Sequence, residues 1–167
     1  MTTGLRIARI QPPHNWHLDA IQQAFSHDIT KLIIGIGSSD KYNTPDNPFT
    51  AQEREHMISL LLEKNWLLSQ TQIFHIPDFP DDAERTQNIV QSVPDFTHII
   101  SDNPQVTNLF NDKIIIKPDN NILIRASDIR QAMMYQQTHS IEQYLSKEVI
   151  NYLEEIQAEE RIKNLLE

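Results

Sequence analysis

Two histidines three residues apart, His14 and His17, have the side chains and the spacing to act on phosphate. They follow an apolar run at residues 5–10 and the segment Gln11-Pro12-Pro13, and they open a helical pattern over residues 17–25. A helix N-terminus attracts anions, and an imidazole beside it adds a hydrogen bond aimed at phosphate. The spacing leaves two alternatives open: surface histidines near a helix cap, or a zinc site, for which no third ligand stands nearby.

The glycine content limits how the chain could hold phosphate. Gly4, Gly35 and Gly37 are the only glycines among 167 residues. A dinucleotide fingerprint needs three glycines in one turn, and a P-loop needs a glycine-rich loop ending in Gly-Lys; neither is present. A phosphate site in this chain must therefore use other donors.

Amino-acid composition excludes several further kinds of site and partner. The absence of cysteine excludes disulfides, thiolate metal sites and a cysteine nucleophile. A formal net charge of -9 argues against double-stranded nucleic acid as a partner, although cations that converge locally could hold a small anion. Because no apolar run reaches 18 residues and the first residues lack a basic-then-apolar layout, we expect a cytoplasmic domain without a membrane span.

Alternating strand and helix patterns must position these side chains. Residues 31–36 are almost wholly apolar, as in a strand buried on both faces, and Thr50-Ala51-Gln52-Glu53 is a capping box. Ser140-Ile141-Glu142-Gln143 is a second capping-box pattern. The expected strands cover residues 5–10, 31–36, 72–76, 97–101 and 113–116, and the expected helices cover residues 17–25, 51–65, 82–92, 104–110, 127–137 and 147–166.

This alternation predicts an α/β fold with one Rossmann-like domain over residues 1–167. The sheet is expected to be parallel with helices on both faces, and a C-terminal helical extension covers about residues 140–167. Ligands of such sheets bind beyond the carboxyl ends of the strands. The site is therefore expected in the loops that follow Ile10, Ile36, Ile76 and Ile100.

The segment Arg9-Ile10-Gln11-Pro12-Pro13-His14-Asn15-Trp16-His17 resembles the G-R-F-Q-P-x-H-x-G-H signature of the nucleotidylyltransferase superfamily. More narrowly, it is similar to that of archaeal-type nicotinamide-mononucleotide adenylyltransferases. The resemblance continues in order through most of the chain. Its further pieces are Ile34-Gly35-Ile36-Gly37-Ser38, Asn47-Pro48-Phe49-Thr50-Ala51-Gln52-Glu53-Arg54, Ile76-Pro77-Asp78, Ala126-Ser127-Asp128-Ile129-Arg130 and Glu160-Arg161-Ile162-Lys163-Asn164-Leu165.

The resemblance implies a reaction in which ATP and nicotinamide mononucleotide give NAD and pyrophosphate. Mg²⁺ is the implied cofactor, bound through the phosphates and not by a metal site of the protein. Such catalysis consists of placement and neutralisation of phosphate charge. The resemblance assigns catalysis to His14, His17 and Arg130, ATP binding to Arg9, Gln11, Gly37, Ser127 and Ile129, and mononucleotide binding to Arg54, Asp78 and Arg85.

Five positions depart from the family pattern: Ala8 and Trp16 replace glycines, Arg125 replaces a serine, Ser127 replaces a threonine but keeps the hydroxyl, and Arg85 replaces a tryptophan that stacks on nicotinamide. The Trp16 indole either fills the adenosine groove or packs along the helix flank. The departures leave two alternatives: a non-catalytic relative that binds a nucleotide, or adenylyl or cytidylyl transfer to another acceptor. Arg54 could instead form a surface ion pair on its helix.

Family members commonly assemble, so the resemblance also allows a homo-oligomer. The last expected helix carries an apolar side, with Val149, Leu153 and Ile162 among its residues. That side could serve an interface between copies or pack onto its own domain.

Overall fold

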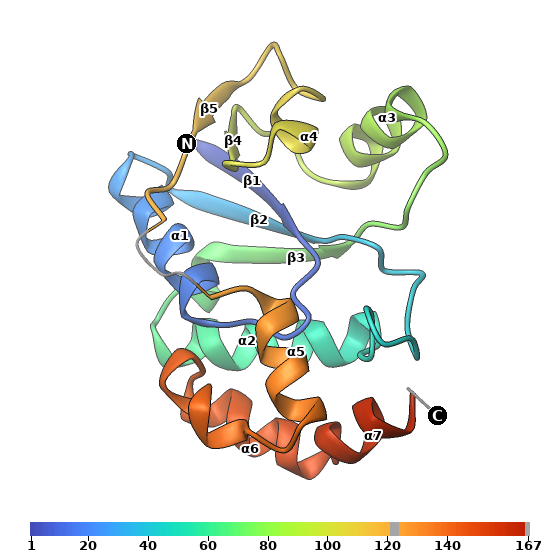
Figure 1. Ribbon diagram of the computed structural model, residues 1–167. Helices are drawn as coiled ribbons and strands as arrows, with labels where there is room; N and C mark the ends of the chain where they lie inside the picture. The colour runs from blue at the N-terminus through green and yellow to red at the C-terminus, as the bar shows by residue number, and fades with distance from the viewer. Residues whose placement is uncertain (121–123, 166–167) are drawn as a thin grey trace.

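The computed structural model describes residues 1–120 and 124–165, and its centre is a five-stranded parallel sheet (Figure 1). The strands are β1 (Thr3–Ala8), β2 (Lys31–Ile36), β3 (Thr71–His75), β4 (His98–Ile100) and β5 (Ile114–Ile116). They lie in the order β3-β2-β1-β4-β5, and every pairing is parallel. The expected α/β class is confirmed, and the order reverses between β1 and β4, where such sheets bind ligands.

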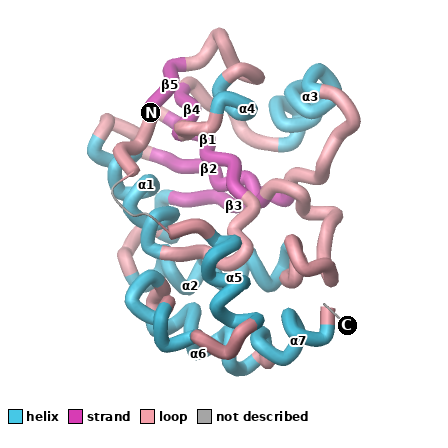
Figure 2. The backbone as a smooth tube through the Cα atoms, in the orientation of Figure 1, coloured by secondary structure: helices cyan, strands magenta, loops and turns pink. Residues whose placement is uncertain are grey.

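Four α-helices connect the strands and three more follow the last strand in the described part of the chain, as the tube view illustrates (Figure 2). They are α1 (Asn15–Ser26), α2 (Ala51–Lys64), α3 (Asp82–Ser92), α4 (Pro104–Thr107), α5 (Ala126–Met134), α6 (Lys147–Glu155) and α7 (Ala158–Asn164). The capping box at Thr50 is confirmed, because Thr50 Oγ1 accepts from the Glu53 N–H and the Glu53 carboxylate accepts from the Thr50 N–H.

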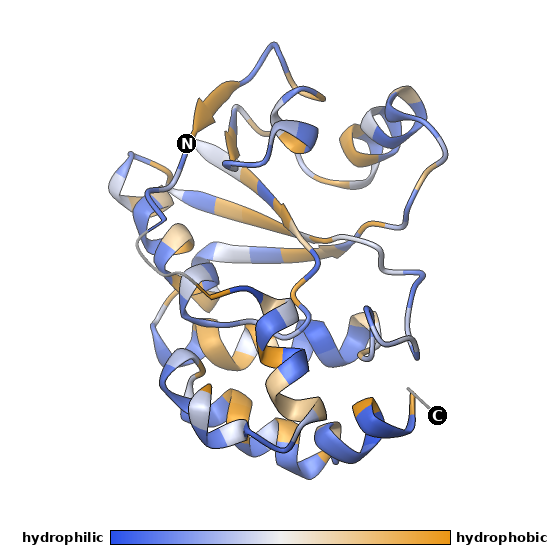
Figure 3. Ribbon diagram, viewed as in Figure 1, coloured by the Kyte–Doolittle hydropathy of each residue, from blue (hydrophilic) through white to orange (hydrophobic). Residues whose placement is uncertain are grey.

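Two apolar cores cover the two faces of the sheet. Helices α3 and α4 pack on one face through Ile89, Val93 and Val106, against Leu5 and Ile33 of the strands. Helices α1, α2, α5, α6 and α7 cover the other face, with buried residues that include Ile21, Met57, Ile129, Val149 and Ile162. Apolar residues run along the central strands, orange in Figure 3, as expected for strands buried on both faces.

The C-terminal extension differs from the expectation in two places. Ser140 caps no α-helix: its hydroxyl donates to the Gln137 carbonyl, and it ends a 3-10 turn over Thr138–Ser140. A second 3-10 turn over Glu142–Tyr144 follows, and Ser146 caps α6 instead. These turns let Ile141 and Leu145 enter the core. The expected single helix over 147–166 is broken at Gln157, whose φ of 51° is left-handed, and its end at residue 166 lies outside the described residues.

The break has a packing reason. Ala158 and Ile162 of α7 are both fully buried against the same core as α6, which one straight helix over this length would not allow. The apolar side of the extension therefore packs on its own domain. Assembly into an oligomer stays a prediction.

Two further expectations concern the end of the first strand and the presence of a membrane span. The first strand ends at Ala8 and not at residue 10, because Ile10 has a φ of 55° and turns the chain toward α1. In the described part of the chain, no helix is long and apolar enough to cross a membrane.

Candidate active site

The carboxyl ends of three strands meet at one edge of the sheet. Ala8 of β1 pairs with Ile36 of β2, and Ile36 pairs with His75 of β3, so the loops that follow lie side by side. Three residues in these loops have left-handed backbone: Ile10 at φ 55°, Ser38 at φ 48° and Asn43 at φ 54°. A β-branched residue in that region is strained, and such strain clusters at functional sites.

The two histidines stand at the N-terminus of α1, as the N-cap and the third helical residue. His14 and His17 are 3% and 8% exposed, and their ring centroids lie 4.2 Å apart in an edge-on arrangement. The backbone N–H of His14 donates to Nδ1 of His17 at 3.2 Å. A neutral His17 must therefore carry its proton on Nε2, which makes that atom a hydrogen-bond donor.

Both imidazoles are held uncharged. Burial, the nearby Arg6 guanidinium and, in the opposite direction, Asp128 together lower the pKa of His14 to about 4. Burial, then His14 and Arg6, lower the pKa of His17 well below its ordinary value. At neutral pH both rings act as neutral donors beside a helix N-terminus, a combination suited to phosphate oxygens.

Arg130 reaches the same loop from α5. It is 6% exposed, its Nη1 donates to the Gln11 carbonyl at 2.9 Å, and its Nη2 lies 3.9 Å from a carboxylate oxygen of Asp46. Burial and the positive charge of Arg9 lower the pKa of Arg130. Arg9 is exposed, so one exposed cation and one buried cation act on each other at this loop.

Arg54 holds the loops together. Its side chain is fully buried, and it donates to the carbonyls of Thr50, Arg9, Gly37 and Ser38 at 3.2, 2.9, 2.8 and 3.1 Å. Burial, followed by repulsion from Arg9, lowers its pKa to about 10. These bonds join α2 to the ends of β1 and β2, so Arg54 positions both loops. Direct contact with a mononucleotide stays a prediction.

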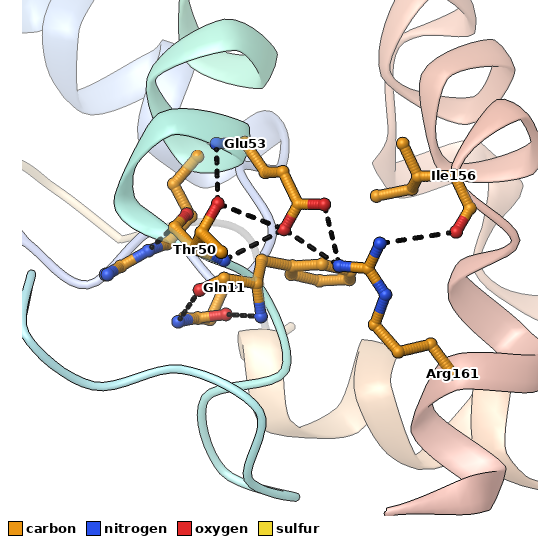
Figure 4. Close-up of polar contacts among 7 residues, drawn as sticks. Gln11, Thr50, Glu53, Ile156 and Arg161 are labelled. Atoms are coloured by element: carbon orange, nitrogen blue, oxygen red, sulfur yellow. Dashed lines mark hydrogen bonds and ion pairs between the residues drawn. The ribbon is translucent and has the colours of Figure 1, made fainter.

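Gln11, expected to bind ATP, is likewise committed to the protein. Its amide nitrogen donates to the Phe49 carbonyl and its amide oxygen accepts from the Phe49 N–H, both at 3.2 Å. Figure 4 shows Gln11 beside the capping box of α2, formed by Thr50 and Glu53, and Arg161 of α7. Arg161 Nη1 lies 2.7 and 2.8 Å from the two carboxylate oxygens of Glu53. The C-terminal extension thereby fastens the helix that carries Arg54.

The expected acceptor side lies at the end of β3. Asp78 accepts from the Ser38 hydroxyl at 2.9 Å and forms an ion pair with Lys41. Burial acts to raise the pKa of Asp78, but the hydrogen bonds from Lys41 and Ser38 outweigh it and the pKa is lowered. Arg85 at the start of α3 is half-buried and acts electrostatically on Asp78. Asp78 and Arg85 are therefore brought together, apart from the histidines.

The three glycines fall into two kinds. A methyl group on Gly4 or Gly35 would come within 2.3 Å of the side-chain Cδ1 of Ile100 or Ile76, so the end of that isoleucine would have to shift to make room. A methyl group on Gly37 would meet its nearest neighbour at 3.6 Å, an ordinary contact. The protein's own packing therefore leaves room at Gly37, at the end of β2 beside the Arg54 carbonyl contacts.

The remaining predicted residues lie around the N-terminus of α5. Ser127 and Arg125 are exposed there, and the N–H of Arg125 donates to the Asp128 carboxylate at 2.9 Å. Ile129 is fully buried in the core, which leaves its backbone as the part that could meet a ligand. In the described ranges, no three His, Asp or Glu side chains are arranged to hold a metal ion.

Two site residues were missed by sequence reasoning or left undecided by it. Arg6 was not singled out, yet it is only 7% exposed and its charge acts on both histidines. Trp16 is 8% exposed, with its ring 6.0 Å from the Arg6 guanidinium. The indole thus packs inward against β1. An arginine within an otherwise apolar strand is the signal that could have revealed the pair.

A separate groove among α5, α6 and α7 shares no residue with this site. Its floor includes Met133 and Leu153, and its rim carries acidic side chains. The acids on the rim are Glu142, Glu154, Glu159 and Glu160. Such a rim repels phosphate, so the groove does not compete as a nucleotide site.

Known proteins resemble the chain over nearly its whole length. A cytidylyltransferase-like family model matches residues 9–132. A nicotinamide-nucleotide adenylyltransferase of Thermococcus sibiricus is 35% identical, with 97% of this chain and 88% of that protein covered. A nicotinamide-nucleotide adenylyltransferase of Pyrococcus horikoshii is 31% identical, with 99% and 89% covered.

Solved structures agree on the fold. A crystal structure of a bifunctional NMN adenylyltransferase/ADP ribose pyrophosphatase from Francisella tularensis has a TM-score of 0.79 at 22% identity. The match covers 98% of this chain and 52% of that one. The extent and identity of the sequence matches show that the chain belongs to the cytidylyltransferase-like family and, within it, to the nicotinamide-nucleotide adenylyltransferases.

Proposed function

We propose that this protein transfers the adenylyl group of ATP to nicotinamide mononucleotide, which gives NAD and pyrophosphate. The observation that carries the proposal is the pair of buried neutral histidines at the N-terminus of α1, which arginines flank at the edge where three parallel strands end. In a chain of net charge -9, this local gathering of cations suits a small polyanion.

The chemistry needs no covalent enzyme intermediate. A phosphate oxygen of the mononucleotide forms a bond to the α-phosphorus of ATP, and the bond from that phosphorus to the bridging oxygen breaks, with its electron pair leaving on pyrophosphate. The attacking phosphate is already ionised at neutral pH, since its second pKa is about 6. No general base is therefore required, and placement dominates.

The protein's own groups then have simple tasks. His17 donates from Nε2, because its Nδ1 is taken by the His14 N–H. Arg130, in the middle of α5, supplies a fixed positive charge toward the leaving pyrophosphate, where its planar fork suits two phosphate oxygens. Arg54 keeps the loops after β1 and β2 at a fixed separation, so the two reacting phosphates meet in line.

Mg²⁺ fits this site as a companion of the phosphates. The charged groups with buried heads are arginines, and carboxylates near them, such as Asp46 and Asp128, stand singly on the exposed side. When bound, the ion neutralises phosphate charge. The protein contributes the cations and the helix ends that orient the same oxygens.

The test is to incubate purified protein with ATP, Mg²⁺ and nicotinamide mononucleotide and to follow NAD by chromatography. We expect NAD from the wild type and a loss of at least about a hundredfold in kcat/KM for His17→Ala, since preorganised donors contribute about that much. The variant must retain the wild-type circular dichroism spectrum. Folded wild type that makes no NAD would refute the proposal.

Because Trp16 and Arg85 depart from the family pattern, two other outcomes of the assay would each identify a different function. If calorimetry detects ATP or NAD binding without turnover, and Trp16→Gly then produces NAD, the chain is a nucleotide-binding relative whose site is closed by the indole. If other phosphorylated acceptors react in place of nicotinamide mononucleotide, with CTP tested beside ATP, the reaction class stands and the substrate assignment is wrong.

A further inference from the structure

Arg6 is a cation in an unusual place. It lies on β1, the central strand, with neighbours on either side, and its guanidinium points into the layer between the sheet and α1. Its Nη1 donates to the Ile100 carbonyl at 3.2 Å, at the carboxyl end of β4. The side chain therefore bridges β1 and β4, the point where the strand order reverses.

Arg6 and the histidine pair form one buried cluster with Trp16. The indole lies on one side of the guanidinium, 6.0 Å away, and all four side chains are at most 8% exposed. Among the described residues, Nε of Arg6 and Nδ1 of His14 are buried without a hydrogen-bond partner. A fold that only needed packing here would not leave polar atoms unpaired, because each costs about 1–3 kcal/mol.

The charged groups around the histidines come from four elements. Arg6 faces them from β1, Asp128 acts on His14 from α5, and His14 acts on His17 within α1. Asp102, after β4, acts on Arg6. Burial lowers the pKa of Arg6 to about 10, against the effect of Asp102, so the guanidinium remains charged at every pH at which histidine titrates.

We propose that Arg6 is a positioning residue of the histidine pair: held by the Ile100 carbonyl and the Trp16 ring, its fixed charge keeps His14 and His17 as neutral donors. The proposal rests on the proposed function for its catalytic meaning. It matters there because bound phosphates attract protons to neighbouring imidazoles. A buried cation near the rings opposes protonation of the imidazoles, and it also adds positive electrostatic potential that favours a bound anion.

Ligand-free protein tests the electrostatic part directly. Histidine side chains are labelled with ¹⁵N and titrated by NMR from pH 8 to about pH 3, below the His14 pKa of about 4, with circular dichroism confirming the fold at each pH. His14→Gln and His17→Gln assign the signals. In Arg6→Met we expect the His14 midpoint to rise by about one pH unit, while Arg6→Lys, which keeps the charge, restores most of the wild-type value.

The matched control is Lys113→Met. Lys113 also stands over an aromatic ring, that of Phe96 at 5.5 Å, on the opposite face of the sheet from α1. Its removal deletes one charge and one cation–π contact without touching the histidines, so no midpoint should move. If both histidine midpoints in Arg6→Met equal those in Lys113→Met within experimental error, the proposal is wrong and Arg6 serves packing alone.

The catalytic part has its own readout. In Arg6→Met the acid-side inflection of kcat/KM for ATP should move to higher pH in step with the His14 midpoint. KM for ATP should rise about threefold to tenfold, as expected when a buried positive charge near the binding site of an anion is lost. If the histidine midpoints move in Arg6→Met but the wild type forms no NAD, the proposed function is refuted. The electrostatic coupling of Arg6 to the histidines would still stand.

Discussion

Arg54→Met distinguishes a residue that builds the site from one that only binds substrate. Arg54 is fully buried and makes four hydrogen bonds to backbone carbonyls of two strand ends and of the α2 cap. A hydrogen bond to a charged group is worth about 1.5–3 kcal/mol, so four bonds at the lower value give about 6 kcal/mol. Relief of the desolvation of a buried cation offsets part of this. We expect a loss of about 3–4 kcal/mol.

The assay is urea unfolding of ligand-free protein, followed by fluorescence and by circular dichroism, together with thermal unfolding. For a chain of this size 1 kcal/mol corresponds to about 2–4 °C, so Tm should fall by about 10 °C. Arg9→Met is the matched control. Arg9 is exposed, so its removal should change stability by no more than about 0.5 kcal/mol.

The alternative makes the opposite forecast. If Arg54 acts mainly as a ligand of the mononucleotide, Arg54→Met should keep the stability of the ligand-free protein to within about 1 kcal/mol and raise KM for the mononucleotide alone. That outcome would refute a loop-holding role for Arg54. Loss of stability with a rise in KM for both substrates would support it, since the loops after β1 and β2 serve both.

Three further predictions follow from the same geometry. Gly35→Ala should lower stability by about 1–3 kcal/mol through overpacking, whereas Gly37→Ala should leave Tm unchanged and raise KM for ATP. A double-mutant cycle of Glu53→Gln and Arg161→Met should give a coupling of about 1 kcal/mol in urea unfolding. Because the pKa of His14 is about 4 in the folded protein and higher when unfolded, unfolding takes up a proton at this residue between pH 6.5 and 4, and His14 alone should lower stability by about 3 kcal/mol across that window. His17, whose pKa is also lowered, adds to the fall, so His14→Gln should reduce the fall without removing it.

The order of elements could be predicted because its signals are local. The capping box at Thr50 and Glu53 places the start of α2 at Ala51, and the apolar run at 31–36 matches β2. The same signature at Ser140 failed. There the burial of Ile141 and Leu145 favours two 3-10 turns, and a local pattern carries no information about distant packing partners.

The location of the site could be predicted from the sequence, but the contacts of its individual side chains could not. The histidines were expected at the end of the first strand, and the structure puts them there as a buried pair. The roles of Gln11 and Arg54 could not be foreseen, because their partners are backbone groups 38 to 45 residues away or in loops. The direction of the Trp16 indole depended on Arg6, a residue ten positions earlier on the neighbouring layer.

Transfer of the α-phosphorus is the central claim, and label from ATP tests it most directly. Wild-type protein is incubated with Mg²⁺, nicotinamide mononucleotide and ATP labelled with ³²P at the α-position, and the products are separated. We predict that NAD carries the label in a one-to-one ratio to unlabelled pyrophosphate, and that His17→Ala transfers almost none. Label that stays in ATP, or appears in free AMP without NAD, would contradict the claim.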